Sequence, residues 1–286
     1  MTWPKQIYAG RGVIEVDRMK STTFDLNNIT PASKMQLRTH FKRDGYLLLK
    51  SFLPTAEVQE VQEIIKQRLK ESNLIENGQP ELQIPEVFQA PSGNENCKVE
   101  TTTNPGLLGQ QDWIKSHPCM VKLLEHPNLY KLFEVLFDSE EITTIPYKWL
   151  RAVGSNLFTG LHRDSVYVGH ISQDILTAWI PITSVPTTNG SLVVAPASHD
   201  SKRWKSVQSE YDSSCGRQGD GTSSGWLCLD PNDIIQKLDV ISTPIWVSED
   251  FGPGDVVILD LNVIHMTSTN VTEQWRISCD TRWLPI

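Results

Sequence analysis

The order of the two hydrophobic periods most constrains what this chain of 286 residues can fold into. Apolar residues recur at helical spacing up to about residue 137, and β-branched and aromatic runs dominate after residue 142. Thr30-Pro31 is typical of a helix start and Asp44-Gly45 of a helix end. Thr55 is the predicted N-cap of a second helix. Its buried face is predicted to be Val58, Val61, Ile65 and Leu69, and two further helices are predicted at 117–125 and 127–137.

Strand-like runs fill most of the second half of the chain, after one short early run at 46–53. Asn189-Gly190 and Gly252-Pro253-Gly254 are turn signals between them. Helices first and strands later, within one unit, predict an α+β chain whose second half is a double-sheet barrel. The predicted strands are 142–153, 174–182, 191–194, 245–248, 255–261 and 275–283.

Three polar stretches show no clear helical or strand periodicity. Residues 1–29 show no sustained period and are predicted to be an N-terminal arm, and 76–106 cannot be placed. Residues 198–232 are predicted to be a long loop inserted between strands, of a length that is usually functional or mobile. We therefore expect a single domain over 1–286.

Composition excludes several function classes. The net charge is -8 and no basic run stands out, so we expect no nucleic-acid partner. No run approaches the length of a membrane span. The five cysteines are widely spaced, and the first twenty residues contain no apolar signal segment, which favours an intracellular, cytoplasmic location. Nothing in the sequence indicates an oligomeric state.

His162-Arg163-Asp164 and the distant His265 are the residues that most strongly indicate chemistry. Two imidazoles and one carboxylate are the ligand set that binds non-haem Fe(II) while leaving coordination positions open. Alternate residues of an extended strand point to one face, so His162 and Asp164 can reach one ion together. His265 follows the apolar run 256–261, which places it at the predicted barrel mouth. The pattern predicts an oxygenase metal site.

Arg276 lies near the start of the last predicted strand. A guanidinium binds a carboxylate through two parallel hydrogen bonds, and the tail of a 2-oxoglutarate buried in a barrel needs such a partner. Thr267 could donate a hydroxyl hydrogen bond to the same carboxylate. Ser278 shares a strand face with Arg276 and is a second candidate.

Two other interpretations compete for the motif. An isolated His-x-Asp is as compatible with a buried histidine paired to an aspartate as with a metal site. His-Arg-Asp also occurs in the protein-kinase catalytic loop, where an asparagine follows five residues after the aspartate. Gly169 occupies that position here, and no glycine-rich nucleotide loop precedes it, so the kinase interpretation fails.

Five features fit one family as a set, over roughly residues 33–283. They are the stretches 44–49, 147–150, 176–181 and 189–199, and the pair His265 with Arg276. The chain resembles the phytanoyl-CoA dioxygenase (PhyH) family of Fe(II)/2-oxoglutarate-dependent oxygenases. It departs at Ala197, where the family usually has glycine, which affects a local turn.

The resemblance implies a double-stranded β-helix (jelly-roll, cupin-like) core with helices packed on one sheet. It implies that His162, Asp164 and His265 bind Fe(II) and that Arg276 binds the C5 carboxylate of the co-substrate 2-oxoglutarate. Trp179 and Trp149 would line the co-substrate pocket, although a core aromatic is as good an interpretation of each. O2 would be consumed, and succinate and CO2 released. Asp164 excludes the related halogenases, which have a small residue in its place.

The substrate itself cannot be derived from the sequence. We expect a small organic molecule that is hydroxylated or further oxidised, with Arg151, Tyr147 and Tyr167 as hypothetical contacts. Two alternatives remain open. One is a non-catalytic metal- or ligand-binding protein of the same fold, and the other is a cupin-like metal enzyme that does not use 2-oxoglutarate.

Overall fold

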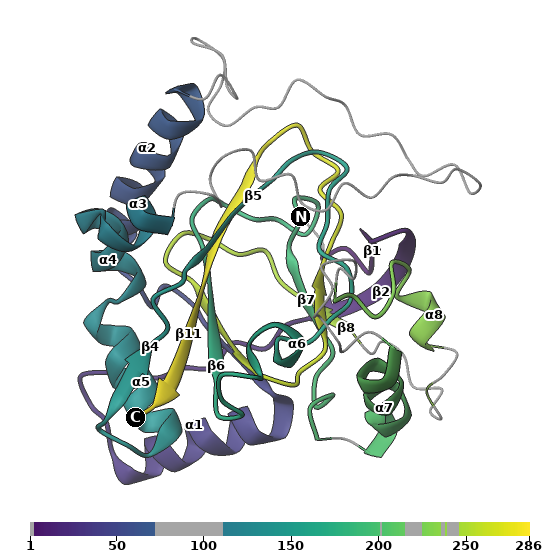
Figure 1. Ribbon diagram of the computed structural model, residues 1–286, viewed down its shortest axis with the longest axis horizontal. Helices are drawn as coiled ribbons and strands as arrows, with labels where there is room; N and C mark the ends of the chain where they lie inside the picture. Colours follow the sequence, from purple (N-terminus) through teal and green to yellow (C-terminus); the bar gives the residue numbers. More distant parts are fainter. Residues whose placement is uncertain (1–2, 72–110, 201, 215–224, 236–237, 239–245) are drawn as a thin grey trace.

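The computed structural model describes residues 3–71, 111–200, 202–214, 225–235, 238 and 246–286 (Figure 1). Two β-sheets face each other in these residues, and helices lie on their outer sides. This mixed α+β arrangement, with two sheets forming a curled jelly-roll-like core, confirms the predicted fold class. The unplaced stretch 76–106 lies outside the described residues. No helix among those described is long and apolar enough to cross a membrane.

The larger sheet has the order β3-β9-β6-β11-β4, and β5 also pairs with β11. Every neighbouring pair is antiparallel. β11 is the longest strand and lies between β6 on one side and β5 and β4 on the other. The strands are β3 (Tyr46–Leu49), β4 (Ile142–Thr144), β5 (Trp149–Val153), β6 (Leu176–Pro181), β9 (Val256–Asp260) and β11 (Arg276–Pro285).

The smaller sheet has the order β1-β2-β8-β7-β10, and only the pair β2 and β8 is parallel. The prediction of an irregular arm over 1–29 is wrong for residues 6–18, which form the hairpin β1–β2. Buried Ile14 and Val16 alternate there with Glu15 and Asp17, a strand signal too short to stand out. The strands are β1 (Gln6–Ala9), β2 (Gly12–Arg18), β7 (Leu192–Val194), β8 (Trp246–Ser248) and β10 (His265–Thr267).

Helices α1 to α5 pack on the outer face of the larger sheet (Figure 1). Thr30 caps α1 and Gly45 ends it with a φ of 75°, as the sequence predicts. The next helix begins at Thr55 itself, one residue before the predicted start, and buries its four predicted apolar residues. The helices are α1 (Pro31–Asp44), α2 (Thr55–Glu71), α3 (Gln111–Ser116), α4 (Pro118–Leu124) and α5 (Pro127–Phe137).

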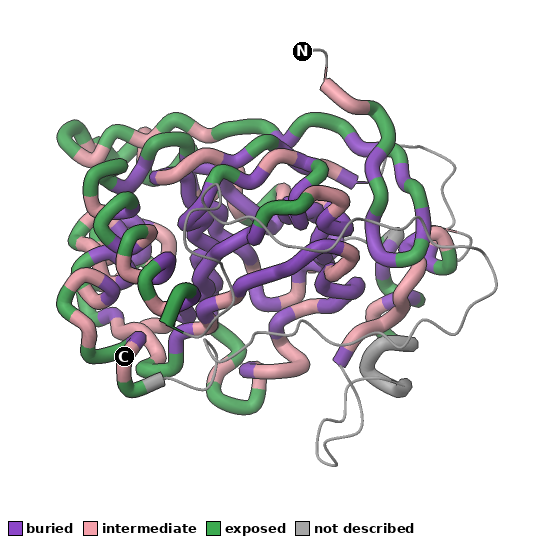
Figure 2. Tube along the Cα trace, turned by 90° about the horizontal axis from the view of Figure 1, so that it is seen from above, coloured by how far each residue is buried: buried purple, intermediate pink, exposed green. Residues whose placement is uncertain are grey.

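The central strands are apolar on both faces because each face packs against a different layer. In β9, Val256 and Ile258 contact the helices, whereas Val257 and Leu259 face the smaller sheet. Figure 2 shows the result, with buried segments running through the middle of the molecule between exposed outer segments.

A second helical layer covers the outer face of the smaller sheet. Trp204 of the 3-10 helix η1 (Lys202–Trp204) packs against Trp246 with ring centroids 6.0 Å apart. The long loop predicted at 198–232 is therefore partly helical. It contains α7 (Lys205–Ser214), and α8 (Asn232–Ile235) follows it. Polar residues on their solvent side conceal the helical period of these short segments.

Candidate functional site

His162, Asp164 and His265 converge, as the sequence predicts. All three are buried, and each offers a ligand atom within 4.8 Å of the other two. The backbones of His162 and His265 exchange two hydrogen bonds of 2.9 Å, so the residues face each other as a bridge and their rings lie 4.2 Å apart. Pairing of backbones far apart in sequence is thus what assembles the metal ligands.

Asp164 reaches the cluster differently from what the motif suggests. The expected extended strand ends after His162, and Asp164 has φ -68° and ψ -23° at the start of the one-turn helix α6 (Ser165–Val168). The backbone N–H of Ser165 donates to Leu261 O at 2.9 Å and fixes this bend. The carboxylate therefore joins the imidazoles through a change of direction and not through strand alternation.

Both imidazoles are oriented by backbone carbonyls. Nδ1 of His162 lies 2.8 Å from Gly160 O, and Nδ1 of His265 lies 3.0 Å from Val263 O. A carbonyl only accepts, so Nδ1 carries the proton and Nε2 offers its lone pair, as a metal ligand requires. Burial and the neighbouring His265 lower the pKa of His162 to about 3, which keeps that ring neutral.

The two carboxylate oxygens of Asp164 each accept one hydrogen bond. Thr177 Oγ1 donates at 2.5 Å to one oxygen, and Arg282 Nη2 donates at 3.0 Å to the other. Burial alone would raise the pKa of Asp164, but Arg282, the two histidines and the Thr177 hydrogen bond together outweigh it and hold the pKa below its usual range. The carboxylate is thus ionised and fixed in direction.

Arg276 is fully buried and incompletely paired. Its Nη1 donates to Ser278 Oγ at 2.5 Å, while Nε and Nη2 have no partner among the described residues. Burial and the charge of Arg151 lower the pKa of Arg276 to about 9. A buried guanidinium with two free donors fits a carboxylate that enters with a ligand. Gly190 leaves room beside it, since a Cβ there would lie 3.3 Å from Arg276 Nε.

One cavity joins the metal ligands to Arg276. Thr267 and Trp179 also line it, as do residues of β5, β6 and β11. Thr267 Oγ1 accepts from the backbone N–H of Thr159 at 2.8 Å, and the ring of Trp179 lies 4.9 Å from that of Phe251. The lining residues are Arg151, Thr159, His162, Asp164, Thr177, Trp179, Leu192, Leu259, His265, Thr267, Arg276, Asp280 and Arg282.

Other candidates from the sequence lie around this cavity without lining it. The Trp149 ring packs under the guanidinium of Arg282 at 4.7 Å, and the Tyr147 ring is tilted against that of Trp149 with centroids 4.4 Å apart. Ser278 is placed by its bond to Arg276, and the Tyr167 ring lies 5.6 Å from that of His162.

Thr177, Asp280 and Arg282 are site residues that the motif does not reveal. Arg276, Ser278, Asp280 and Arg282 occupy alternate positions of β11, and Ile277 and Cys279 between them pack against the helices. Polar residues at the alternate positions 276, 278, 280 and 282, with apolar Ile277 and Cys279 between them, are the signal that could have found Asp280 and Arg282.

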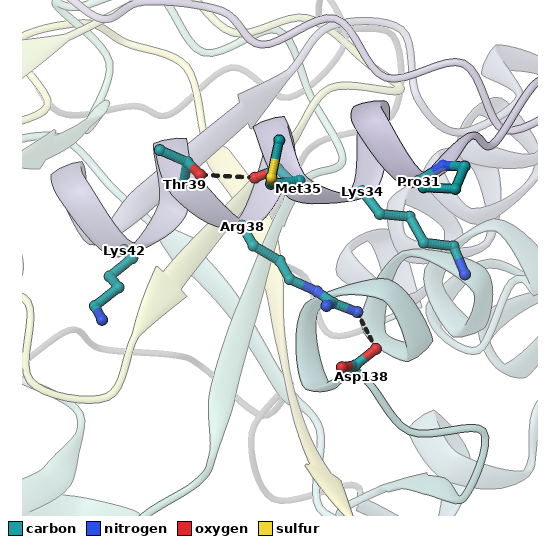
Figure 3. Close-up of a pocket in the computed structure, with 7 residues that line it drawn as sticks. All are labelled: Pro31, Lys34, Met35, Arg38, Thr39, Lys42 and Asp138. Carbon is teal, nitrogen blue, oxygen red and sulfur yellow. Dashed lines mark hydrogen bonds and ion pairs between the residues drawn. The ribbon is translucent and has the colours of Figure 1, made fainter.

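A hollow outside the barrel has a different character. Lys34, Met35 and Lys42 on the exposed side of α1 line it (Figure 3). Arg38 points from α1 to Asp138, with which it pairs, and also donates to the Val135 carbonyl at 2.5 Å. This surface contains no group of buried polar residues, so the chemistry lies in the cavity between the sheets.

Known structures share this fold. The chain superposes on the non-haem α-ketoglutarate-dependent carbocyclase SnoK from nogalamycin biosynthesis with a TM-score of 0.55 and 18% identity, over 93% of this chain and 87% of that one. For the epimerase SnoN of the same pathway the TM-score is 0.54 at 19% identity, over 90% and 82%. For apo EctD from S. alaskensis it is 0.54 at 16%, over 94% and 82%.

No curated protein is significantly similar to the chain in sequence. Residues 41–278, however, match the model of the family described as phytanoyl-CoA dioxygenase (PhyH). The match covers most of the chain and includes the three converging residues and Arg276. Together with the intact His-Asp-His triad, it shows that this chain belongs to the phytanoyl-CoA dioxygenase family of non-haem Fe/2-oxoglutarate-dependent oxygenases.

Proposed function

We propose that the protein is an Fe(II)- and 2-oxoglutarate-dependent dioxygenase that hydroxylates, or further oxidises, a small organic molecule and releases succinate and CO2. The observation that supports this most is the shared cavity, in which a cluster of two histidines and one ionised carboxylate accompanies a buried, half-paired Arg276. A structural metal site has no use for the second feature.

The residues fit the two groups that such an enzyme needs. His162, Asp164 and His265 would hold Fe(II), and Arg276 would bind the far carboxylate of 2-oxoglutarate, with Ser278 fixing the guanidinium at 2.5 Å. Thr267 would lie beside that carboxylate. Bound iron supplies the activation of O2.

The protein's own contribution is position and exclusion of water. The ligand residues, Thr267 and Arg276 are all buried, so polar contacts within the cavity act in a medium of low dielectric. Trp179, Leu192 and Leu259 form the apolar part of the wall. Such a wall restricts water near the oxidising centre and directs oxidation to a bound substrate.

The test is succinate formation from 2-oxoglutarate by the purified protein with Fe(II) and O2. We expect measurable turnover that His265→Ala abolishes. Arg276→Ala should raise the KM for 2-oxoglutarate at least about tenfold, the value of one good charged hydrogen bond. His170→Ala is the matched control, because His170 is exposed and outside the cluster.

Three results would separate the alternatives. Metal binding without succinate formation would indicate a non-catalytic relative. Turnover of an organic compound with unchanged kinetics in Arg276→Ala would indicate a metal enzyme that does not use 2-oxoglutarate. Activity that survives His265→Ala would remove the proposed iron centre.

A further inference from the structure

The charges around the cavity do not balance. Among the described lining residues, the guanidiniums of Arg151, Arg276 and Arg282 face only two carboxylates, those of Asp164 and Asp280. The histidines act as neutral ligands, so one positive charge is left over. Fe(II) and 2-oxoglutarate carry opposite double charges and leave this excess unchanged. An uncompensated charge inside a protein is costly unless a partner enters with it.

Arg282 has hydrogen-bonding capacity to spare. Its side chain is 2% exposed, and only Nη2 is used, which donates to Asp164 at 3.0 Å and lies 3.8 Å from Asp280 Oδ2. Its Nε and Nη1 are buried without a partner among the described residues. The Trp149 ring covers one face of the guanidinium at 4.7 Å. Nitrogens left free in the plane of a stacked guanidinium are donors for a planar anion.

Arg151 lies nearer to solvent and is held by the same strand. Its Nε donates to Asp280 Oδ2 at 2.9 Å, and within the described part of the chain this is its one side-chain hydrogen bond. Burial opposes its charge, but Asp280, with smaller contributions from Asp164 and Tyr167, outweighs burial and raises the pKa of Arg151. The side chain is 21% exposed, and Arg151 is the one residue, among the described residues that line the cavity, that is not buried.

Arg282 is separated from the proposed co-substrate anchor. Arg151 lies between the two, since it pairs across the sheet with Ser278 and donates to Asp280. Arg276 and Arg282 are six residues apart on β11, about 20 Å along a strand that rises about 3.3 Å per residue. Arg282 contacts the iron ligand Asp164, whereas Arg276 pairs with Ser278 at the other end. A five-carbon diacid that extends from the metal to Arg276 therefore leaves the unpartnered nitrogens of Arg282 for a second molecule, and Arg151, held on Asp280, is the further guanidinium of the same cavity.

We propose that Arg151 and Arg282 bind a carboxylate of the primary substrate, so that the enzyme oxidises a small carboxylic acid. This proposal rests on the proposed function. The single excess positive charge indicates the chemical class of the substrate. One carboxylate neutralises this charge, whereas a phosphate ester, with nearly two negative charges at neutral pH, would reverse it. A neutral substrate would leave it uncompensated. Arg151 meets the acid first, and Arg282 holds it beside the metal.

The test uses the anaerobic protein with Fe(II) and 2-oxoglutarate and matched pairs of probes. Hexanoate and benzoate are compared with hexanamide and benzamide, and with hexyl phosphate. Binding is followed by the change in the visible charge-transfer absorbance of the Fe(II)–2-oxoglutarate complex. We expect at least one carboxylate to bind about tenfold or more tightly than its amide and its phosphate counterpart. Arg151→Gln should abolish that preference and Arg151→Lys should restore part of it.

The control separates the substrate site from the co-substrate site. The KM for 2-oxoglutarate in succinate formation should rise much less in Arg151→Gln than the tenfold expected for Arg276→Ala, and Arg43→Gln, at an exposed arginine, should change neither quantity. Equal binding of acids and amides, or tighter binding of hexyl phosphate, would overturn the proposal. So would a tenfold rise in that KM in Arg151→Gln with the acid preference intact. Absence of the Fe(II)–2-oxoglutarate charge-transfer absorbance in the unmodified protein would instead count against the proposed function.

Discussion

Arg282 donates a hydrogen bond of 3.0 Å to Asp164, and both side chains are 2% exposed. The carboxylate of the metal cluster is thus tied to a residue in the second half of β11. The opposite oxygen accepts from Thr177, so the ligand has one orientation before any ion binds. Such outer contacts set both the direction and the charge of a metal ligand.

Arg282→Met should weaken iron binding. Loss of an outer partner of a metal ligand typically reduces affinity about 10–100-fold. It should also lower the free energy of unfolding of the metal-free protein by about 3–5 kcal/mol, since Asp164 becomes a buried, less compensated charge. Titration calorimetry with Fe(II) under anaerobic conditions and urea unfolding measure the two effects. An unchanged Fe(II) dissociation constant would contradict the assigned role of Arg282.

Arg276→Met should stabilise the free protein while impairing co-substrate binding. It removes a buried charge with two unpaired nitrogens, so the free energy of unfolding should rise by at least about 1 kcal/mol. At one hundred times its dissociation constant, 2-oxoglutarate should stabilise the unmodified protein by about 2.7 kcal/mol and the variant hardly at all. Thermal unfolding with and without 2-oxoglutarate checks both. A less stable free variant would show that the guanidinium is satisfied without a ligand.

Gly190→Ala should disturb Arg276 by placing a methyl group against its side chain. Gly190 has φ +63°, which costs an alanine about 1–2 kcal/mol, and the new Cβ would lie 3.3 Å from Arg276 Nε. We expect lower stability and a several-fold higher KM for 2-oxoglutarate. Gly252→Ala is the control, because a Cβ there would meet its nearest atom at 3.9 Å. Equal behaviour of the two variants would count against the contact.

Ala197→Gly should stabilise the fold. Ala197 has φ +60°, the conformation in which glycine avoids a steric cost, and its N–H donates to Asp44 O at 2.8 Å at the end of α1. The gain should be up to about 1 kcal/mol, because the added freedom of glycine in the unfolded chain offsets part of it. The urea midpoint measures it. Ala195→Gly, at a position without positive φ, should shift the midpoint the other way.

The buried Tyr46 should make the free energy of unfolding decrease at alkaline pH. Burial raises the pKa of Tyr46 to about 12 from an unfolded value near 10, so the folded state retains a proton that the unfolded state releases. Stability is therefore complete below pH about 10 and is lost as pH rises toward about 12, by about 3 kcal/mol in total. Tyr46→Phe should flatten this part of the stability profile. Tyr147→Phe, at a 39% exposed ring, is the comparison, and an equal slope in both would refute the assignment.

The convergence of His162, Asp164 and His265 was predictable because the ligand chemistry restricts the residue types, and the apolar run before His265 indicates where it lies. The backbone conformation that brings Asp164 to the cluster was not predictable. Whether residue 164 continues a strand or begins a helix depends on the bond from Ser165 to Leu261, a contact across nearly a hundred residues. Residue spacing alone contains no information about that partner.

The supporting residues were harder to predict for a related reason. Thr177 and Arg282 have no sequence motif, and their importance arises only when antiparallel pairing brings β6 and β11 together. The helices at 31–44 and 127–137 were predictable because caps, prolines and apolar period agree locally. Trp149 shows the remaining ambiguity, since it packs on an arginine of the site without lining the cavity.

The parallel pairing of β2 with β8 ties the start of the chain to the sheet that presents His265. The family match begins only at residue 41, so a shortened protein that starts there would lack this hairpin. It would expose the edge of β8 and the buried Trp246. An unpaired strand edge of this kind is a template for aggregation. A protein shortened to the start of the family match should therefore become less soluble before it loses its ability to bind iron.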